Sequence, residues 1–279
     1  MNKTKIEWVR NPDGSQGYTW NPITGCLNGC PYCFARNLAQ GRLEKRYLSN
    51  KNLSPDLLEI QKAYNRNKLE PFQDPFYPRF WPERLHDKDL RSLVMPVSDE
   101  VASKYVLGKS LGIFACDMSD LFGIGIPREW TWAVLDVIRS CPQHRFYLLT
   151  KQPQNLVKWS PFPENCWVGV SVDGTDNAPL GRTLYTGFDR IQAKVKFISF
   201  EPLLADTRLD PRDLSKDFAD VHWLIIGAET GNRKEKPALS EVHKWAKEII
   251  EAADEAGIPV FIKDNLKYPV KRQEWPLTK

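Results

Sequence analysis

The stretch GCLNGCPYC (residues 25–33) places three cysteines at C-x3-C-x2-C spacing near the amino terminus. Cys26, Cys30 and Cys33 can bind three irons of an iron–sulfur cube and leave the fourth iron without a protein ligand. The alternatives are a structural zinc site or three unrelated thiols. A zinc site normally has four protein ligands, and the nearest histidine in the sequence, His86, is far from the triad. We therefore favour a [4Fe-4S] cluster.

The same spacing, with Tyr32 directly before the third cysteine, resembles the signature of the radical S-adenosylmethionine (SAM) enzymes. The resemblance implies that SAM chelates the open iron through its amino and carboxylate groups. It also implies that an electron from the cluster cleaves SAM to a 5'-deoxyadenosyl radical, which abstracts hydrogen from a substrate. An external one-electron donor, flavodoxin- or ferredoxin-like, would reduce the cluster.

The composition is that of an ordinary globular protein. The chain has 279 residues, of which 42% are hydrophobic and 27% charged, and a net charge of +4. We expect no secretory signal, because residues 1–10 contain no apolar run, and no membrane span. Six cysteines, three of them in a tight triad, indicate a reducing cytoplasm rather than a disulfide framework. The weak positive charge permits a nucleic-acid partner without implying one.

Short apolar runs alternate with helical patterns, which is typical of a parallel sheet covered on both faces. The predicted strands are residues 18–24, 113–116, 146–150, 167–172, 196–200, 223–226 and 260–262. Helices are predicted over 34–47, 130–141 and 242–253, the last with Ser240 as a plausible N-cap and Gly257 in its stop. We expect one domain over residues 1–279, an α/β fold of the incomplete parallel β/α barrel type with about six to seven strands.

Residues 48–109 are predicted to be an irregular insertion or wrapping segment. Within it, residues 70–85 (EPFQDPFYPRFWPERL) hold four prolines among five aromatic residues, which excludes a continuous helix or a central strand. We favour an extended segment whose rings pack into the domain. The alternative is a wall of the substrate site, whose rings stack on a base.

Polar residues stand at the carboxyl ends of the predicted strands, where the site of a β/α barrel lies. They are Asp117, Ser119, Asp120, Thr150, Lys151, Ser171, Asp173, Ser199, Glu201, Glu229, Lys263 and Asp264. Among them we expect Glu201 and Glu229 to act in catalysis and Thr150 to contact the cofactor. Cys116 also lies near a strand end, where its thiol can hand a hydrogen atom to a substrate radical, although a buried core thiol is the default.

Further residues match the radical SAM pattern. The segment VSVDG (170–174) resembles the fourth-strand segment of many radical SAM enzymes, which implies that Ser171 or Asp173 meets the SAM ribose. Arg182 matches a place where a basic residue often pairs with the SAM carboxylate, and Tyr32 would lie near the adenine.

One part of the radical SAM pattern is absent. The Gly-Gly-Glu commonly found after the second strand, which binds the SAM amino group, is missing, and residues 116–120 (CDMSD) take its place. Asp117 or Ser119 could accept the same hydrogen bonds there.

Four other motifs resemble an uncharacterised radical-SAM-like family found in phages and bacteria. They are DMSDLF (117–122), LTK (149–151), SFEPLL (199–204) and IGAE (226–229). That resemblance covers nearly the whole chain and supplies no substrate.

We expect a cytoplasmic, monomeric radical SAM enzyme that acts on a nucleobase, nucleoside or nucleic acid. The phage-family likeness, the mildly basic charge and the aromatic insertion motivate this substrate class. Two other classes stay open. One is a non-catalytic iron–sulfur or zinc protein that senses redox state or scaffolds a partner. The other is a hydrolytic barrel enzyme that uses rim carboxylates such as Asp117, Glu201 and Glu229.

Overall fold

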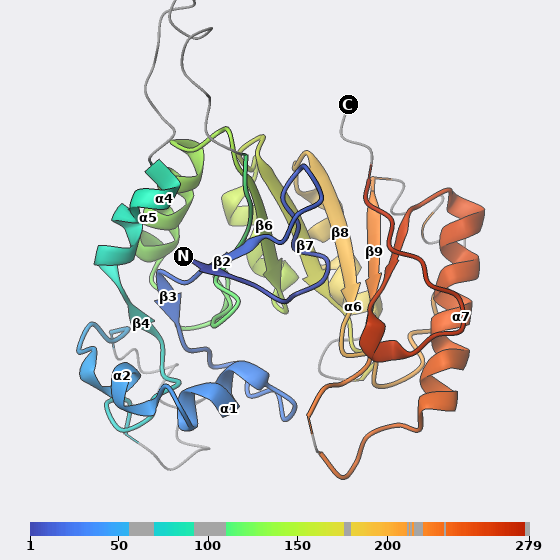
Figure 1. Cartoon of the computed structure of the whole chain (residues 1–279), viewed down its shortest axis with the longest axis horizontal. Helices are drawn as coiled ribbons and strands as arrows, with labels where there is room; N and C mark the ends of the chain where they lie inside the picture. Colours follow the sequence, from blue (N-terminus) through green and yellow to red (C-terminus); the bar gives the residue numbers. More distant parts are fainter. Residues whose placement is uncertain are drawn as a thin grey trace, which may run out of the picture.

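The protein has a mixed α/β fold built around one mostly parallel sheet (Figure 1). The computed structural model describes residues 1–55, 70–91, 110–175, 180–210, 212, 214, 220–231 and 233–276, without the side chains of residues 89, 91 and 182–184. None of the described helices combines the length and the apolar character that crossing a membrane requires.

The described part of the chain forms an eight-stranded sheet. Its order is β1 (Asn2–Lys3), β2 (Tyr18–Trp20), β5 (Gly112–Ala115), β6 (Arg145–Thr150), β7 (Cys166–Ser171), β8 (Val195–Phe200), β9 (Trp223–Ile226) and β10 (Val260–Ile262). Strand β1 pairs antiparallel with β2, and every later pair is parallel. Because these strands are parallel, their carboxyl ends meet at one edge of the sheet. The predicted parallel α/β sheet is confirmed, and the antiparallel β1 is an addition to it.

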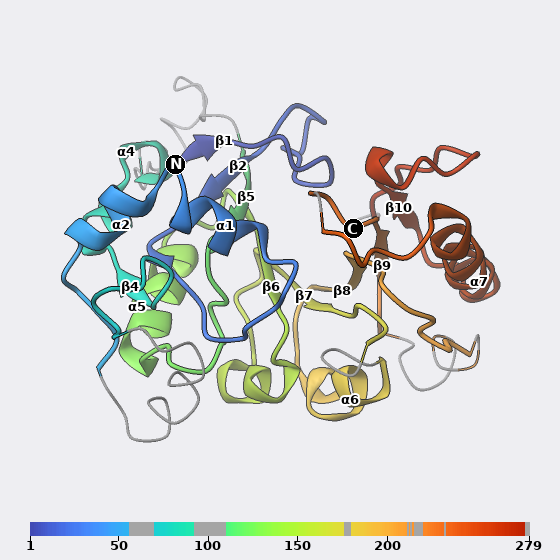
Figure 2. The same cartoon turned by 90° about the horizontal axis from the view of Figure 1, so that it is seen from below.

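Helices α5 (Arg128–Arg139), α6 (Leu180–Tyr185) and α7 (Leu239–Ala256) lie on one side of the sheet, and the amino-terminal segment crosses the other side (Figure 2). The remaining elements are α1 (Phe34–Gln40), α2 (Glu44–Ser49), α4 (Lys88–Arg91), a small sheet of β3 (Ile23–Thr24) and β4 (Arg79–Phe80), and the 3-10 helices η2 (Pro82–His86), η3 (Pro153–Trp159), η4 (Phe188–Arg190) and η6 (Asp264–Leu266). Helices α1 and α2 lie beside the carboxyl edge of the sheet (Figure 1).

Both faces of the sheet are apolar, because both are covered. On the helix side, Ile113, Leu148, Val168 and Leu224 belong to the large core that includes α5 and α7. The opposite face carries a second core made mainly of aromatic rings, which are Trp8, Phe114, Tyr147, Trp167, Phe197, Trp223 and Phe261. These rings occupy the amino-terminal part of that face. After the pair of Gly169 and Phe197, the next residues on this face of β7 and β8 are the hydroxyl-bearing Ser171 and Ser199.

Two predicted helix boundaries are wrong. The helix predicted over 34–47 is divided into α1 and α2, and Gly41 stands at the end of α1 as its C-cap. Helix α7 has Ala238 as its N-cap rather than Ser240, because the Glu241 side chain accepts a hydrogen bond from the Ala238 N–H at 3.1 Å. Gly257 ends α7 in the left-handed conformation, as its position in the sequence predicts.

The predicted insertion is described in part. Residues 48–55 and 70–91 contain the end of α2 and β4, η2 and α4, whereas 56–69 and 92–109 lie outside the described residues. In the proline- and aromatic-rich stretch, Phe76, Tyr77 and Trp81 are buried and Phe72 is exposed. The prediction that its rings pack into the domain is therefore confirmed for most of them.

Gly169 tests the packing of the aromatic core. A Cβ atom at this position would lie 2.3 Å from the ring of Phe197, so the ring occupies the space that a side chain would need. We expect Gly169→Ala to lower the free energy of unfolding by about 1–3 kcal/mol, measured by urea denaturation. The matched control is Gly181→Ala in α6, where nothing lies within 4 Å of the added atom and the helix gains about 0.5–1 kcal/mol. Equal stability of the two variants would contradict this packing.

Candidate functional site

A cavity of about 520 Å³ opens at the carboxyl edge of the sheet. It lies between the cysteine loop and the ends of the parallel strands. The predicted site residues that line it are Cys26, Cys30, Tyr32, Cys33, Asp117, Ser119, Thr150, Ser171, Glu201 and Glu229. The folded chain thus brings these ten residues from the cysteine loop and the strand ends to one cavity, and their roles there stay predictions.

The cysteine loop is fixed by backbone contacts to two distant segments. The Gly25 N–H donates to the carbonyl of Met118 at 2.9 Å, and the Cys26 N–H donates to the carbonyl of Phe76 at 3.0 Å. Gly25 has a φ of 88°, and a Cβ there would lie 2.4 Å from the Tyr77 carbonyl oxygen. Only glycine combines this conformation with so close an approach of two backbones.

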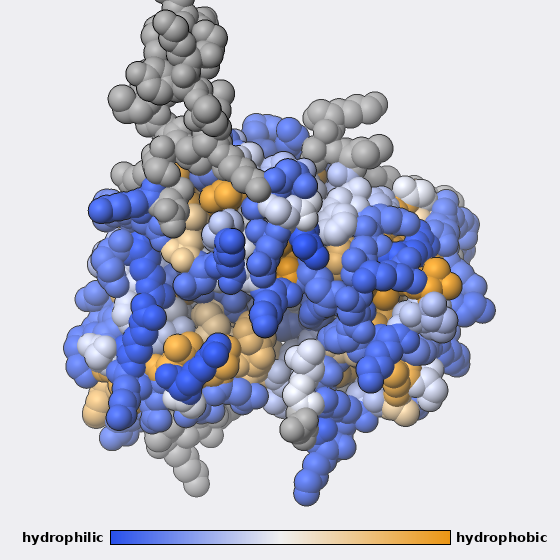
Figure 3. Space-filling model, viewed as in Figure 1, coloured by the Kyte–Doolittle hydropathy of each residue, from blue (hydrophilic) through white to orange (hydrophobic). Residues whose placement is uncertain are grey.

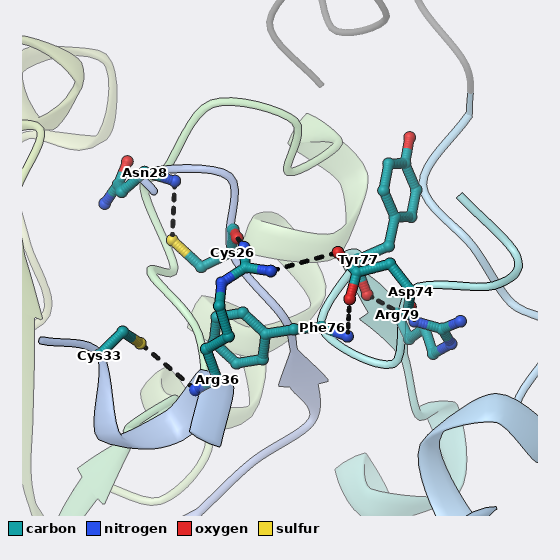
Figure 4. Close-up of polar contacts among 8 residues, drawn as sticks. All are labelled: Cys26, Asn28, Cys33, Arg36, Asp74, Phe76, Tyr77 and Arg79. Atoms are coloured by element: carbon teal, nitrogen blue, oxygen red, sulfur yellow. Dashed lines mark hydrogen bonds and ion pairs between the residues drawn. The ribbon is translucent and has the colours of Figure 1, made fainter. Parts of the chain in front are cut away.

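Arg36 ties the cysteine loop to the proline- and aromatic-rich stretch (Figure 4). Its guanidinium donates to the carbonyl of Cys26 at 3.2 Å and to Asp74 at 3.3 Å, and it lies 4.9 Å from the centre of the Phe76 ring. Asp74 is fully buried. Arg79 in turn donates to the carbonyl of Asp74 at 2.7 Å. The stretch therefore acts mainly as a support for the cysteine loop, and of its five rings only that of Phe76 lines the cavity.

The sulfur atoms accept hydrogen bonds from the loop itself. The N–H of Asn28 donates to Cys26 Sγ at 3.4 Å, and the N–H of Arg36 donates to Cys33 Sγ at 3.3 Å (Figure 4). Hydrogen bonds of this kind favour the thiolate and are a feature of cysteines that hold iron–sulfur clusters.

Burial opposes ionisation of the Cys26 and Cys30 thiols. It raises the pKa of Cys26 well above its ordinary value, and the negative charge of Asp120 raises it further. Burial also raises the pKa of Cys30, while the positive charge of Lys151 lowers it. A bound cation would favour the thiolate form of both residues.

Within the described ranges, no three His, Cys, Asp or Glu side chains are gathered closely enough to share one metal ion. Cys26, Cys30 and Cys33 lie on one loop and line one cavity, and a cluster would bind each thiolate at a separate iron.

Asp120 joins the cysteine loop to the strand ends. Its carboxylate accepts from the side-chain amide of Asn28 at 3.0 Å, from the Thr150 hydroxyl at 2.7 Å and from the Lys151 N–H at 3.0 Å. The sequence identified Asp120 only as one of several polar residues after a strand. The Thr150 hydroxyl, expected to contact the cofactor, donates to this carboxylate instead.

Tyr32 and Asp173 form a second link. The buried Asp173 accepts a hydrogen bond from the Tyr32 hydroxyl and bonds from both the N–H and the hydroxyl of Thr175, at 2.9 and 2.7 Å. Burial raises the pKa of Tyr32, so the hydroxyl stays protonated and donates. Asp173 is not among the residues that line the cavity, so its predicted contact with the SAM ribose has no support from its position, and its hydrogen bond helps to orient the Tyr32 ring.

The carboxylates of the opposite wall are paired. Lys263 on the β10 side donates to Glu201 after β8, and Trp8 Nε1 donates to the same carboxylate at 3.3 Å. Between them stands Gly227, where a Cβ would lie 3.0 Å from the Lys263 side chain and 3.2 Å from that of Glu201. The missing side chain thus makes room for the ion pair. Glu229 forms a separate ion pair with Arg233 at 2.7 Å.

Cys116 lies away from the cavity. Its backbone has a φ of 62°, which breaks the alternation of β5 and turns the thiol into the core on the helix side. Burial raises the pKa of Cys116 to about 12. Its predicted contact with a substrate radical therefore has no support from its position. Arg182 lies in α6, and its side chain is outside the described part of the structure.

Asp117 and Ser119 occupy the place of the absent Gly-Gly-Glu. Both line the cavity, but the Ser119 hydroxyl donates to the Gly25 carbonyl at 2.6 Å, so it serves the cysteine loop. Asp117 accepts from the Asn21 side chain at 2.5 Å, and burial raises its pKa to about 6.

The sequence was compared with protein families, with curated proteins and with solved structures. The family described as "Protein of unknown function (DUF5131)" matches residues 3–274. The chain belongs to this family. No curated protein and no solved structure matches it. The description of DUF5131 names no activity. The residues that line the cavity are therefore the basis for inferring a function of this DUF5131 member.

The raised pKa of Asp117 predicts a pH dependence of stability. An unfolded aspartate has a pKa of about 3.9. Between this value and about 6 the folded protein holds a proton that the unfolded chain has released. The free energy of unfolding therefore falls as the pH rises, by about 3 kcal/mol in total for this group.

Urea denaturation of the wild type and of Asp117→Asn between pH 4 and 7 measures this effect. We expect the wild type to lose stability relative to the variant across that range. Parallel pH profiles would contradict the burial of an ionisable Asp117.

Proposed function

We propose that this protein is a radical SAM enzyme, in which Cys26, Cys30 and Cys33 hold a [4Fe-4S] cluster and SAM completes the coordination of the fourth iron. One observation carries the proposal. The three cysteines of a C-x3-C-x2-C loop line the same cavity as the polar ends of the parallel strands, and none of the described residues that line it is a fourth cysteine or a histidine. An iron without a protein ligand would face a cavity able to hold a small molecule.

The order of the sheet supports the finer fold of an incomplete β/α barrel. Sequentially ordered parallel strands with their helices on one side are what successive right-handed β-α-β crossovers produce. The strands follow an arc, with α5, α6 and α7 outside it (Figure 2). The cavity lies at the carboxyl edge of this arc, which is the active edge of β/α barrels.

The bound cluster and SAM would supply the radical chemistry, and the residues of the chain would bind, orient and exclude water. The Tyr32 ring, held by Asp173, provides a flat surface for the adenine. Asp117, which lines the cavity, is placed to accept a hydrogen bond from the SAM amino group. Glu201 and Glu229, across the cavity, face the substrate.

Reductive cleavage of SAM tests this proposal. After anaerobic reconstitution with iron and sulfide, we expect dithionite and SAM to yield 5'-deoxyadenosine with the wild type and only background with Cys30→Ala. Cys141→Ala is the matched control, because Cys141 is a buried core thiol away from the cavity, and it should keep the activity. The product is measured by liquid chromatography.

The other outcomes separate the alternative classes. A bound metal without any 5'-deoxyadenosine from the wild type would favour a redox-sensing protein or a scaffold. A hydrolytic activity that survives the loss of all three cysteines would favour catalysis by Asp117, Glu201 and Glu229. Each result would overturn the radical SAM proposal.

For the substrate we propose a nucleobase, nucleoside or nucleic acid. Phe34, the first residue of α1, is half exposed and lines the cavity. Hydrophobic surface gathers near α1 on a face that is otherwise mostly hydrophilic (Figure 3). Exposed rings beside a cavity can stack on a base. We further propose a cytoplasmic monomer that receives electrons from an external flavodoxin- or ferredoxin-like donor.

An electrophoretic mobility shift tests whether the substrate is a polymer. We expect labelled DNA or RNA to be shifted at low salt and released at high salt, because contacts to phosphates release counterions. No salt-dependent shift with either nucleic acid would contradict a polymer and leave the nucleobase or nucleoside.

A further inference from the structure

Two buried polar atoms in the cavity have no hydrogen-bond partner. Among the described side chains, Lys151 Nζ and Ser199 Oγ are the buried nitrogen and oxygen atoms that lack one. Both residues line the cavity, and Ser199 is only 1% exposed. An ammonium or hydroxyl group enclosed without a partner is costly, so its presence at a cavity points to a ligand that completes it.

These two residues stand at one level of the sheet. Ser171 on β7 is the register partner of Ser199 on β8, and Thr150 is that of Val170, so Lys151 follows at the level of Ser171. Lys151, Ser171 and Ser199 therefore form a row across three adjacent strands, directly beyond the aromatic core. All three line the same cavity.

The other charged side chains in this part of the cavity have partners. Lys263 pairs with Glu201, and the Asp120 carboxylate is taken up by four donors, none of which is the Lys151 ammonium. Lys151 Nζ lies 5.2 Å from the centre of the Tyr32 ring, and a ring face does not replace an anion. Among the described residues no carboxylate hydrogen-bonds to Lys151 Nζ, although its charge lowers the pKa of the neighbouring Cys30 thiol.

We propose that Lys151, with Ser171 and Ser199, forms a binding subsite for an oxyanion, which is the carboxylate or phosphate of a small ligand. The ammonium supplies the charge, and the hydroxyls donate to the remaining oxygens. The subsite does not rest on the cysteine loop holding a cluster, because its atoms belong to the ends of three strands. Arg182, which the radical SAM resemblance places near the SAM carboxylate, is the other residue that could bind a carboxylate.

Isothermal titration calorimetry with two pairs of probes tests the subsite. S-adenosylhomocysteine and 5'-methylthioadenosine differ in the amino-acid end, and adenosine monophosphate and adenosine differ in the phosphate. For at least one pair we expect the wild type to bind the member that carries the carboxylate or phosphate about ten-fold or more tightly than its counterpart. The pair that shows the preference identifies the source of the oxyanion. The protein is used without added iron, so failure of the cluster proposal does not affect the result.

Substitutions of Lys151 and Ser199 test whether these residues cause the preference for the ligand that carries the carboxylate or phosphate. Lys151→Met should abolish the preference and leave binding of the uncharged member unchanged. Ser199→Ala should weaken the preference and raise the urea midpoint of the free protein, because it removes a buried hydroxyl without a partner. Lys158→Met is the matched control, since it removes an exposed lysine outside the cavity and should keep the preference.

Three results would overturn the proposal. The first is equal binding, or no binding, of both members of each pair by the wild type. The second is a preference that survives in Lys151→Met. The third is a loss of preference in Lys158→Met as large as in Lys151→Met, which would mean that net charge alone is responsible.

Discussion

The architecture of the site depends on how the cysteine loop is held against the carboxyl edge of the sheet. A loop with three thiols is useful only if its sulfurs face a defined cavity. Here Asp120 accepts hydrogen bonds from the loop and from the end of β6 together, so one carboxylate sets the distance between them. The backbone bonds of Gly25 and Cys26 add a second and a third attachment. Loss of any of these links would displace the sulfurs relative to the strand ends.

The cavity exists because the side chains become smaller toward the carboxyl ends of the strands, on the face of the sheet that carries the aromatic core. Aromatic rings fill this face at the amino-terminal level, and Gly169 lets Phe197 lie flat there. One level farther, serines replace the rings, and at the level beyond, Gly227 leaves room for the Glu201–Lys263 pair. The packed floor excludes water from below, while the polar walls remain available to a ligand. The decrease in side-chain size along this face therefore produces both the packed aromatic core and the cavity beside it.

The sequence predicted the broad fold and the place of the site for identifiable reasons. Short apolar runs indicate buried parallel strands, and the carboxyl ends of such strands meet, so residues as distant as Ser171 and Glu229 were expected together. What could not be predicted were the partners. Thr150 and Ser119 carry suitable hydroxyls, but both donate within the chain, and this depends on contacts with Asp120 and Gly25 that no local pattern encodes. The alternation of side chains along β5 would place the Cys116 side chain on the face of the aromatic core. The left-handed backbone conformation of Cys116 itself turns the thiol to the helix side.

The central claim is that the three thiols hold a cluster with one open iron, and electron paramagnetic resonance tests it most directly. The protein is reconstituted anaerobically with iron and sulfide, reduced with dithionite, and measured before and after addition of SAM. The account predicts an iron–sulfur signal that changes when SAM is added and is missing from Cys33→Ala. A colourless protein without a signal, or one zinc ion per chain bound by four protein ligands, would contradict it.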